Sequence, residues 1–167
     1  QAGVNGISVD KPVEARLSDV DEMIAECETR GIVFAGGNLQ RAIGEVQEAA
    51  RWLHAGDFGE IRGASVHGWG GEISGGGCQH IAVLRLFTGA EITEVIAWGA
   101  PQEALEKDDD EGLMINAQCK LSNGLICPIF SEATLTRGVD VWTDDALIRW
   151  DWGPPVIYQG FDDAGAR

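Results

Sequence analysis

The tripeptide Asp10-Lys11-Pro12 places a lysine directly after the largely apolar, strand-like run Val4 to Val9. Pro12 has no backbone N–H and a fixed φ, so it ends the strand and favours an extended conformation at Lys11. Open α/β sheets assemble their reactive groups beyond the carboxyl ends of their strands. The ammonium group of Lys11 is therefore a candidate for chemistry, although a solvated lysine before a strand-ending proline would have the same local sequence.

A second candidate region is the run Gly75-Gly76-Gly77-Cys78-Gln79-His80, which leads into a predicted helix ending at Thr88-Gly89. A histidine that titrates near neutrality can accept and return a proton, whereas a glutamine amide can only hydrogen-bond a substrate. One residue along a helix rotates a side chain by about 100°. Which of Gln79 and His80 faces a pocket therefore decides what chemistry this region can perform.

Two helices and one strand are predicted in the first third of the chain. A helix over residues 19–30, with Ser18 as its N-cap, carries its apolar residues on one stripe. A strand over residues 32–35 follows, and a second helix runs from about Leu39 to Ala55 with one buried face. Each helix is followed by a glycine that can adopt the left-handed conformation of a helix cap.

From Ile61 onward the pattern is mainly that of β-strands. Apolar and polar residues alternate along residues 113–121, and Ser122-Asn123-Gly124 then turns the chain into residues 125–130. A second hairpin is predicted to pair residues 139–142 with residues 147–150. Alternation of this kind predicts antiparallel strands with one buried face.

The composition excludes several classes of partner. The chain has 12 basic and 27 acidic residues and a net charge of −15, which repels nucleic acid and anionic membranes. No apolar run is long enough to span a bilayer and no signal pattern opens the sequence, so a cytoplasmic location is predicted. The cysteines form no C-x-x-C pair and the histidines are widely spaced, so neither a disulfide framework nor a metal site is expected.

The order of these segments resembles the second half of the Gfo/Idh/MocA oxidoreductases. That family closes its nucleotide-binding domain with Glu-Lys-Pro, where this chain has Asp10-Lys11-Pro12. Gly36-Gly37-Asn38 and Phe58-Gly59-Glu60-Ile61-Arg62 then match the family's later segments in order, followed by the glycine run and a histidine-containing helix. The resemblance covers nearly the whole chain.

This resemblance implies an α+β fold, in which the end of a Rossmann-type α/β domain is followed by an open, mainly antiparallel β-sheet with helices on one face. Residues 1–57 would be the remnant and edge of the nucleotide-binding domain with linking helices. Residues 58–167 would be the substrate-binding and oligomerisation domain. A length of 167 residues is too short for a Rossmann unit plus a complete second domain, and no G-x-G-x-x-G follows a strand. We therefore expect the main dinucleotide-binding portion to be absent from this sequence.

The resemblance also implies site residues. The family's lysine lies beside the nicotinamide and the reacting hydroxyl, which makes Lys11 a catalytic candidate and, with Pro12, a cofactor-binding candidate. Counting back from the helix end places Gln79, a substrate-binding candidate, at the family's histidine position. His80 is then one residue out of register, and a helix shortened by one residue would return it to the site as the second catalytic candidate.

Four further residues are candidates for substrate binding. Asn38 and Arg41 loosely match a G-x-N-x-R segment of the family, although Asn38 fits the role of a helix N-cap equally well. His67 and Trp69 lie on the same side of the strand that begins at Ile61 and could face a sugar-sized cavity, where an aromatic ring would stack on the substrate.

Two functions remain open. The first is an NAD- or NADP-dependent oxidoreductase that acts on a small-molecule sugar, cyclitol or polyol. The second is a non-catalytic binding or regulatory module with the same fold. Gly75 and Ala82, where the family has aspartates, favour the module, and Lys11 favours the enzyme.

All tryptophans except Trp52 lie in the strand region. They lie either on an open sheet face that forms a homodimer or homotetramer, or beneath the chain's own helices.

Overall fold

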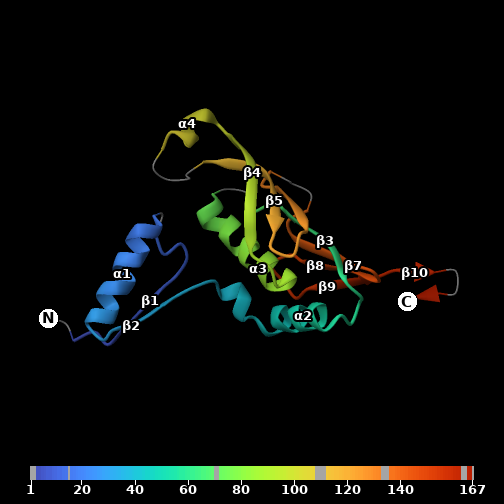
Figure 1. Ribbon diagram of the computed structural model, residues 1–167, viewed down its shortest axis with the longest axis horizontal. Helices are drawn as coiled ribbons and strands as arrows, with labels where there is room; N and C mark the ends of the chain where they lie inside the picture. Colours follow the sequence, from blue (N-terminus) through green and yellow to red (C-terminus); the bar gives the residue numbers. More distant parts are fainter. Residues whose placement is uncertain are drawn as a thin grey trace. The chain divides into compact units, whose positions relative to one another are not determined.

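The computed structural model describes residues 3–14, 16–69, 72–107, 112–132, 136–162, 165 and 166. The chain divides into two compact units, Gln1–Leu39 and Gln40–Arg167. Figure 1 shows the elements of both units. No helix in the described part of the chain has the length and apolarity that a bilayer crossing requires.

The first unit is a β-α-β segment. Strand β1 (Gly6–Val9) pairs in parallel with β2 (Val33–Gly36), and α1 (Leu17–Thr29) connects them. The register pairs Val9 with Gly36, so both strands end at the same edge of the small sheet. The predicted order of strand, helix and strand is therefore confirmed, with boundaries shifted by one or two residues.

The two ends of α1 compare differently with the sequence prediction. Gly31 has φ of 64°, as expected for the glycine that follows the helix. The N-cap is Arg16, whose side chain makes no capping bond, so the prediction of Ser18 as N-cap was wrong. Because the helix begins one residue before Ser18, the serine hydroxyl donates to the Asp19 carboxylate at 3.1 Å instead of capping backbone N–H groups.

The second unit contains a seven-stranded sheet with the order β4-β5-β6-β3-β7-β8-β9. Its strands are β3 (Ile61–His67), β4 (Ile92–Ala100), β5 (Met114–Leu121), β6 (Ile126–Phe130), β7 (Gly138–Thr143), β8 (Ala146–Trp150) and β9 (Val156–Gln159). Its helical segments are η1 (Leu39–Ala42), α2 (Gly44–Ala55), η2 (Ile73–Gly77), α3 (Cys78–Thr88) and α4 (Gln102–Leu105). Two short strands, β10 (Phe161–Asp162) and β11 (Gly165–Ala166), pair with each other.

Neighbouring strands of the large sheet are antiparallel except at its centre, where β3 and β6 run parallel. Both predicted hairpins are confirmed, because β5 pairs with β6 and β7 pairs with β8. The expectation of an open, mainly antiparallel sheet is also confirmed. The predicted helix over residues 39–55 is interrupted at Ile43, whose extended backbone separates η1 from α2.

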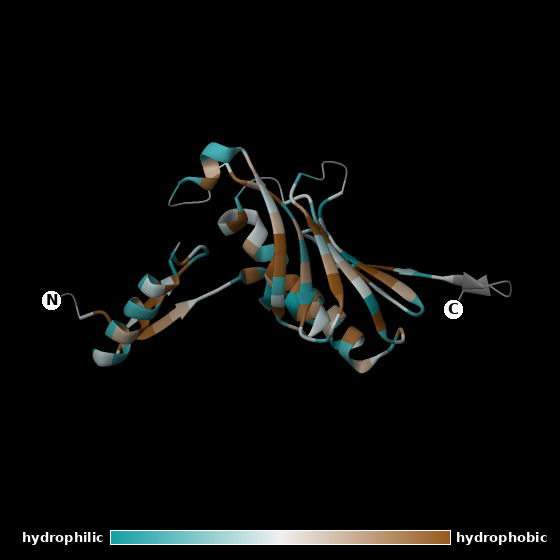
Figure 2. Ribbon diagram, turned by 45° about the horizontal axis from the view of Figure 1, so that its top comes forward, coloured by the Kyte–Doolittle hydropathy of each residue, from teal (hydrophilic) through white to brown (hydrophobic). Residues whose placement is uncertain are grey.

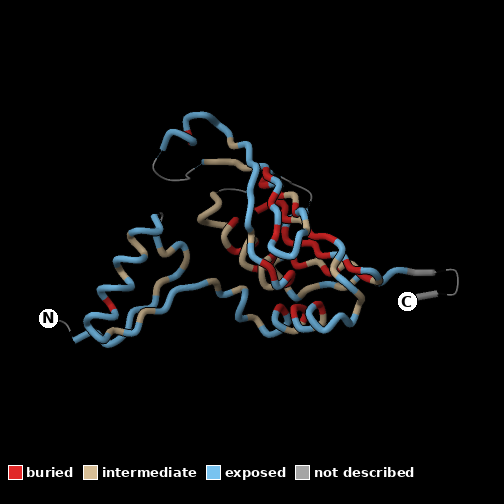
Figure 3. Tube along the Cα trace, viewed as in Figure 1, coloured by how far each residue is buried: buried red, intermediate tan, exposed pale blue. Residues whose placement is uncertain are grey.

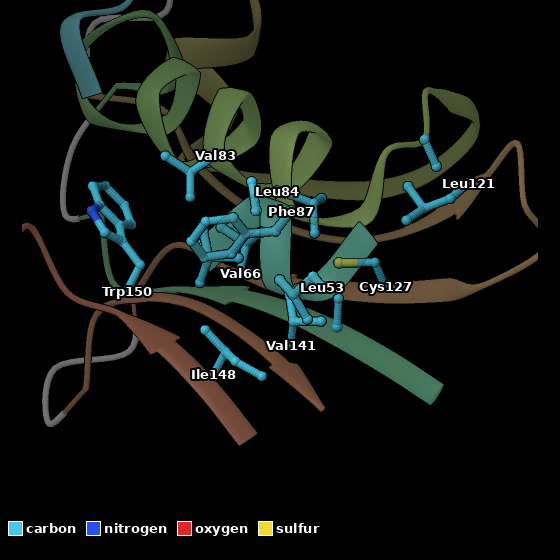
Figure 4. Packing of buried hydrophobic residues seen from close by; sticks show 14 of the residues in the cluster. Leu53, Val66, Val83, Leu84, Phe87, Leu121, Cys127, Val141, Ile148 and Trp150 are labelled. Atoms are coloured by element: carbon cyan, nitrogen blue, oxygen red, sulfur yellow. The ribbon is translucent and has the colours of Figure 1, made fainter. Parts of the chain in front are cut away.

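Helices α2 and α3 supply the apolar side chains that cover one face of this sheet. Figure 3 shows the buried residues concentrated in the sheet and in these helices. Figure 4 shows side chains of α3 directed onto the strands, with Leu84 and Phe87 close to Val66. Both α3 residues are fully buried. Burying a side chain of this kind contributes about 1.5–3 kcal/mol, so α3 is a principal source of stability for the unit.

The described helices leave much of the opposite face of the sheet, here termed the open face, exposed. Figure 2 shows apolar residues along its strands. Its exposed large side chains include Ile96, Trp98, Phe130 and Tyr158, with 64%, 63%, 49% and 51% of their surface accessible. The tryptophans of the strand region are thus divided, since Trp150 is buried in the core whereas Trp98 is exposed.

One aromatic residue of the open face covers a glycine. Gly63 of β3 lies opposite Trp142 of β7, and a Cβ atom at Gly63 would overlap the Trp142 indole ring. We predict that Gly63→Ala displaces this indole into water and shifts its fluorescence emission to longer wavelength. The free energy of unfolding should change by less than about 1 kcal/mol, because alanine regains some strand propensity.

A matched control for this variant is Ser65→Ala, on the same face of β3. Ser65→Ala adds no atom beneath the Trp142 indole, so the emission spectrum of this variant should equal that of the wild type. An unchanged spectrum in Gly63→Ala, recorded with Trp142→Phe to assign the signal, would contradict the cross-strand packing.

Candidate active site

The first unit brings two of the predicted site residues to one sheet edge. Lys11 follows the end of β1 by two residues, and Asn38 follows the end of β2 by two residues. Because β1 and β2 are parallel, both lie beyond the carboxyl end of the sheet, where α/β folds bind ligands. The backbone N–H of Lys11 donates to the Asp10 carboxylate at 2.8 Å, which fixes the turn after β1.

Side chains of the segment after Lys11 reinforce this edge. Val13 packs over Gly36, where an added Cβ would lie 2.9 Å from a Val13 methyl group. Lys11 and Asn38 are half-buried, whereas Pro12 is exposed. The predicted Arg41 belongs to η1 of the second unit and is exposed, and its backbone carbonyl accepts a hydrogen bond from the Gln47 side chain.

The second unit contains a cluster of three tryptophans around one histidine, here termed the Trp–His cluster: Trp69, His80, Trp150 and Trp152. The His80 ring centroid lies 5.2 Å from that of Trp150, 5.3 Å from that of Trp152 and 6.1 Å from that of Trp69. These residues come from the end of β3, the start of α3 and the end of β8, so three elements converge here.

The backbone at Trp152 is unusual. Its φ is 58°, the only positive value at a non-glycine residue in the described chain. A bulky side chain rarely adopts this conformation, and such strain is concentrated at functional sites. Strand β8 ends at Trp150, and the left-handed conformation at Trp152 brings the centroids of the two indole rings to 5.3 Å.

His80 is fully buried within this cluster. Its Nδ1 lies 2.9 Å from the Gly76 carbonyl oxygen, one helical turn earlier. Its Nε2 has no hydrogen-bond partner among the residues that the structure describes. Burial lowers the pKa of His80, which keeps the imidazole neutral. Gln79, the neighbouring candidate, is also buried in the first turn of α3.

A pH dependence of stability follows from His80. Because its pKa is lowered on folding, the unfolded chain binds a proton more readily below its ordinary pKa of 6.5. The contribution of His80 to the free energy of unfolding should therefore fall as the pH is lowered from about 7 to about 5. His80→Phe removes this titration, so urea unfolding at both pH values should show a smaller acid loss in the variant. An equal loss in both proteins would contradict the neutral, buried state of His80.

His67 contacts a different set of residues. Its Nε2 lies 3.1 Å from Asp140 of β7, whose carboxylate also accepts two hydrogen bonds from Arg149 of β8, at 2.6 and 2.7 Å. We term this the His67–Asp140–Arg149 network. Burial opposes ionisation of Asp140, but the hydrogen bonds from Arg149 and His67 outweigh it and lower its pKa to about 2. The hydrogen bond to Asp140 raises the pKa of His67.

The structure therefore separates His67 from Trp69, which the sequence placed on one side of the strand. Gly68 has φ of 68°, so the alternation of β3 ends before Trp69. Trp69 packs in the core beside the glycine-rich turn, while His67 joins Asp140. Sequence reasoning missed Asp140 and Arg149, although the predicted hairpin register places these two opposite charges directly across from each other.

Two surface clefts of the second unit lie away from these residues. One of about 540 Å³ is lined by α2 and by Pro154 and Pro155. The other, of about 690 Å³, lies at the end of α2 and includes His54 and Asp144. Neither cleft is lined by a predicted site residue.

The arrangement of these elements is the fold found in part of a class of solved oxidoreductases and dehydrogenases. An NAD-binding protein from Listeria innocua matches with a TM-score of 0.70 and 15% identity, over 97% of this chain and 55% of its own. An aldose-aldose oxidoreductase from Caulobacter crescentus, complexed with glycerol, matches with a TM-score of 0.69 and 19% identity, over 92% and 56%. The WlbA dehydrogenase from Bordetella pertussis, in complex with NADH and UDP-GlcNAcA, matches with a TM-score of 0.68 and 16% identity, over 86% and 51%.

The present chain thus spans little more than half the length of these solved structures. No protein-family model and no curated protein matches the sequence. At these identities the likeness establishes the fold alone.

Proposed function

We propose that this chain is the substrate-binding and oligomerisation part of an NAD(P)-dependent oxidoreductase of the Gfo/Idh/MocA type, acting on a hydroxyl group of a sugar, cyclitol or polyol. The observation that carries the proposal is the fold: nearly the whole chain matches solved oxidoreductases, one of them named for aldoses and one complexed with NADH. In the proposed enzyme, the ammonium group of Lys11 hydrogen-bonds the substrate oxygen and Asn38 contributes from the same sheet edge.

The described residues do not by themselves fit a whole dinucleotide. The first unit supplies two parallel strands and one helix, and the turn after β1 reads Asp10-Lys11-Pro12, without the glycines that admit a pyrophosphate. Binding of NAD or NADP would therefore require residues outside this sequence. The role proposed for this chain is to hold and orient the substrate.

A non-catalytic binding or regulatory module is the second candidate function. The burial of His80 favours it, because an imidazole with no accessible surface cannot take a proton directly from a substrate. Gly75 and Ala82 favour it as well, since neither provides a carboxylate to orient a catalytic histidine.

We further propose that the open face of the sheet joins copies of this chain into a homodimer or homotetramer. Its exposed aromatic and aliphatic side chains, among them Trp98, Ile96 and Tyr158, suit an apolar interface. Sedimentation equilibrium over a range of concentrations tests this proposal, and Trp98→Glu should shift the equilibrium to the monomer. A wild-type protein that stays monomeric at all concentrations would contradict it.

The activity is tested by fluorescence titration of NADH and NADPH, first with this chain and then with any longer form of the protein. Binding by the longer form alone is expected. Hydride transfer to a panel of sugars and polyols would follow, with Lys11→Ala expected to lower kcat/KM by a factor of about 100 or more.

Lys107→Ala is the matched control for this variant. Lys107 is exposed after α4 and belongs neither to the sheet edge of Lys11 nor to the strands of the proposed interface, so its replacement should leave activity unchanged. A longer form that binds NADH but oxidises no substrate of the panel would favour the non-catalytic module.

A further inference from the structure

The glycine-rich turn before α3 is held by side chains that follow it in the sequence. Residues Ile73–Gly77 form a single wide helical turn, in which the N–H groups of Gly76 and Gly77 donate to the Glu72 carbonyl at 3.1 and 3.3 Å. Wide turns of this kind are rare and are often found at functional sites.

This turn lies against Trp69. A Cβ atom at Gly76 would lie 3.0 Å from the Trp69 carbonyl oxygen, and one at Gly77 would lie 3.1 Å from the Trp69 indole. The glycines thus allow the backbone to approach the tryptophan closely. The carbonyl groups of a backbone that packs against this indole need hydrogen-bond donors, because a buried carbonyl without a donor destabilises the fold.

Two side chains of the first turn of α3 supply such donors. The Cys78 thiol contacts the Ser74 carbonyl at 2.9 Å, and the Nδ1 of His80 lies 2.9 Å from the Gly76 carbonyl. A carbonyl oxygen can only accept, so the proton of a neutral His80 lies on Nδ1. The Nε2 atom, which a proton carrier would present to its substrate, is buried beside Trp150.

We infer that His80 is a positioning residue: its Nδ1–H fixes the glycine-rich turn through the Gly76 carbonyl, and its imidazole exchanges no proton with a substrate. The inference rests on the proposed function for what the turn serves, namely the placement of Gln79, the substrate-binding candidate that follows it in the sequence. The hydrogen bond and the tautomer are independent of that function.

The tautomer is tested directly by ¹⁵N NMR of the wild-type chain labelled at histidine. We expect the resonances of His80 to show a neutral imidazole protonated at Nδ1, assigned by comparison with His80→Phe. A neutral ring protonated at Nε2, or a ring that titrates with the ordinary pKa of a solvated histidine, would overturn the inference. This measurement needs no cofactor and no substrate.

Three substitutions separate the two ring nitrogens. The amide N–H of asparagine lies at nearly the same distance from Cα as Nδ1, whereas that of glutamine corresponds to Nε2. His80→Asn should keep hydrogen exchange of the Gly76 and Gly77 amides within about threefold of the wild type. His80→Gln and His80→Phe remove the side-chain donor of the Gly76 carbonyl and leave it only the backbone N–H of Cys78, so exchange should be about 5-fold to 100-fold faster.

His54→Asn is the matched control, since His54 is exposed on α2 and should affect neither amide. If His80→Asn exchanges as fast as His80→Phe while both remain folded, the positioning role is wrong. If a longer form transfers hydride, His80→Asn should retain its kcat and its pH profile, whereas loss of activity in His80→Asn with intact Gly76 exchange would identify a proton carrier. Absence of any hydride transfer would count against the proposed function only.

Discussion

Gly138→Ala is expected to lower the free energy of unfolding by about 3 kcal/mol or more, the range of severe single substitutions. Gly138 begins β7 with φ of 127°, a conformation that side chains rarely adopt. An added Cβ would also overlap the carbonyl oxygen of Trp150 on β8. The overlap involves backbone and not a flexible side chain, so β8 must shift, and with it the Trp–His cluster. Urea unfolding followed by tryptophan fluorescence measures the loss.

Gly124→Ala separates backbone strain from overlap. Gly124 has φ of 88° in the turn between β5 and β6, and an added Cβ there would meet no atom within 4 Å. This control should cost only about 1 kcal/mol. Equal losses in the two variants would show that β8 does not approach Gly138 as closely as described.

Asp140→Ala is expected to lower the free energy of unfolding by about 3–5 kcal/mol, the usual cost of removing one partner from a buried ion pair. It leaves the Arg149 guanidinium without its two acceptor bonds and His67 without its 3.1 Å contact. The Asp140 side chain is 11% exposed and the Arg149 side chain is 30% exposed, so solvent screens the interaction only in part. Chemical denaturation at neutral pH provides the measurement.

The double variant Asp140→Ala, Arg149→Met tests whether the loss comes from an unpaired charge. Removing both charges should recover part of the stability, so that the double variant is more stable than Asp140→Ala alone. If the double variant loses the sum of the two single losses, the two residues are not energetically coupled.

Acid titration gives an independent check on the same network. The pKa of Asp140 is lowered on folding from 3.8 to about 2, so its contribution is present above about pH 4 and is lost as the pH falls towards 2. The pKa of His67 is raised, so its contribution is present below 6.5 and is lost as the pH rises through the folded value. His67→Gln should therefore lose stability relative to the wild type at about pH 5 more than at about pH 9.

Local patterns predicted the hairpins and helix ends because their physical causes are local. Alternating burial along residues 113–121 and a glycine turn define the β5–β6 hairpin whatever lies around it. Gly31 and Gly56 end their helices because both take positive φ. Ser18 failed as an N-cap because several neighbouring residues can begin a helix, and tertiary packing selects among them.

The positions of the candidate site side chains could not all be predicted from the spacing of residues in the sequence. Helix α3 begins at Cys78, directly after the wide turn over Ile73–Gly77, and this turn sets the directions in which the Gln79 and His80 side chains leave the helix. No periodicity in the sequence reveals a wide turn. The cluster around His80 depends on a left-handed conformation at Trp152 that its residue type disfavours. Lys11 and Asn38, which remain predicted site residues, could be placed at one sheet edge because each follows a strand by two residues, which is a local signal.

The parallel contact between β3 and β6 determines how this protein can fold. Strands β4, β5 and β6 form one antiparallel meander, and this meander is inserted in the sequence between β3 and its other neighbour, β7. Strands β5 and β6 are joined by the short turn 122–125, and β4 and β5 by residues 101–113, whereas β3 and β7 must meet across about 70 intervening residues. The chain loses the entropy of closing a long loop before it gains the contacts that the closed loop allows, so high contact order slows folding. We therefore expect the meander to form before β3, against which α3 packs, docks between two partners that are synthesised after it.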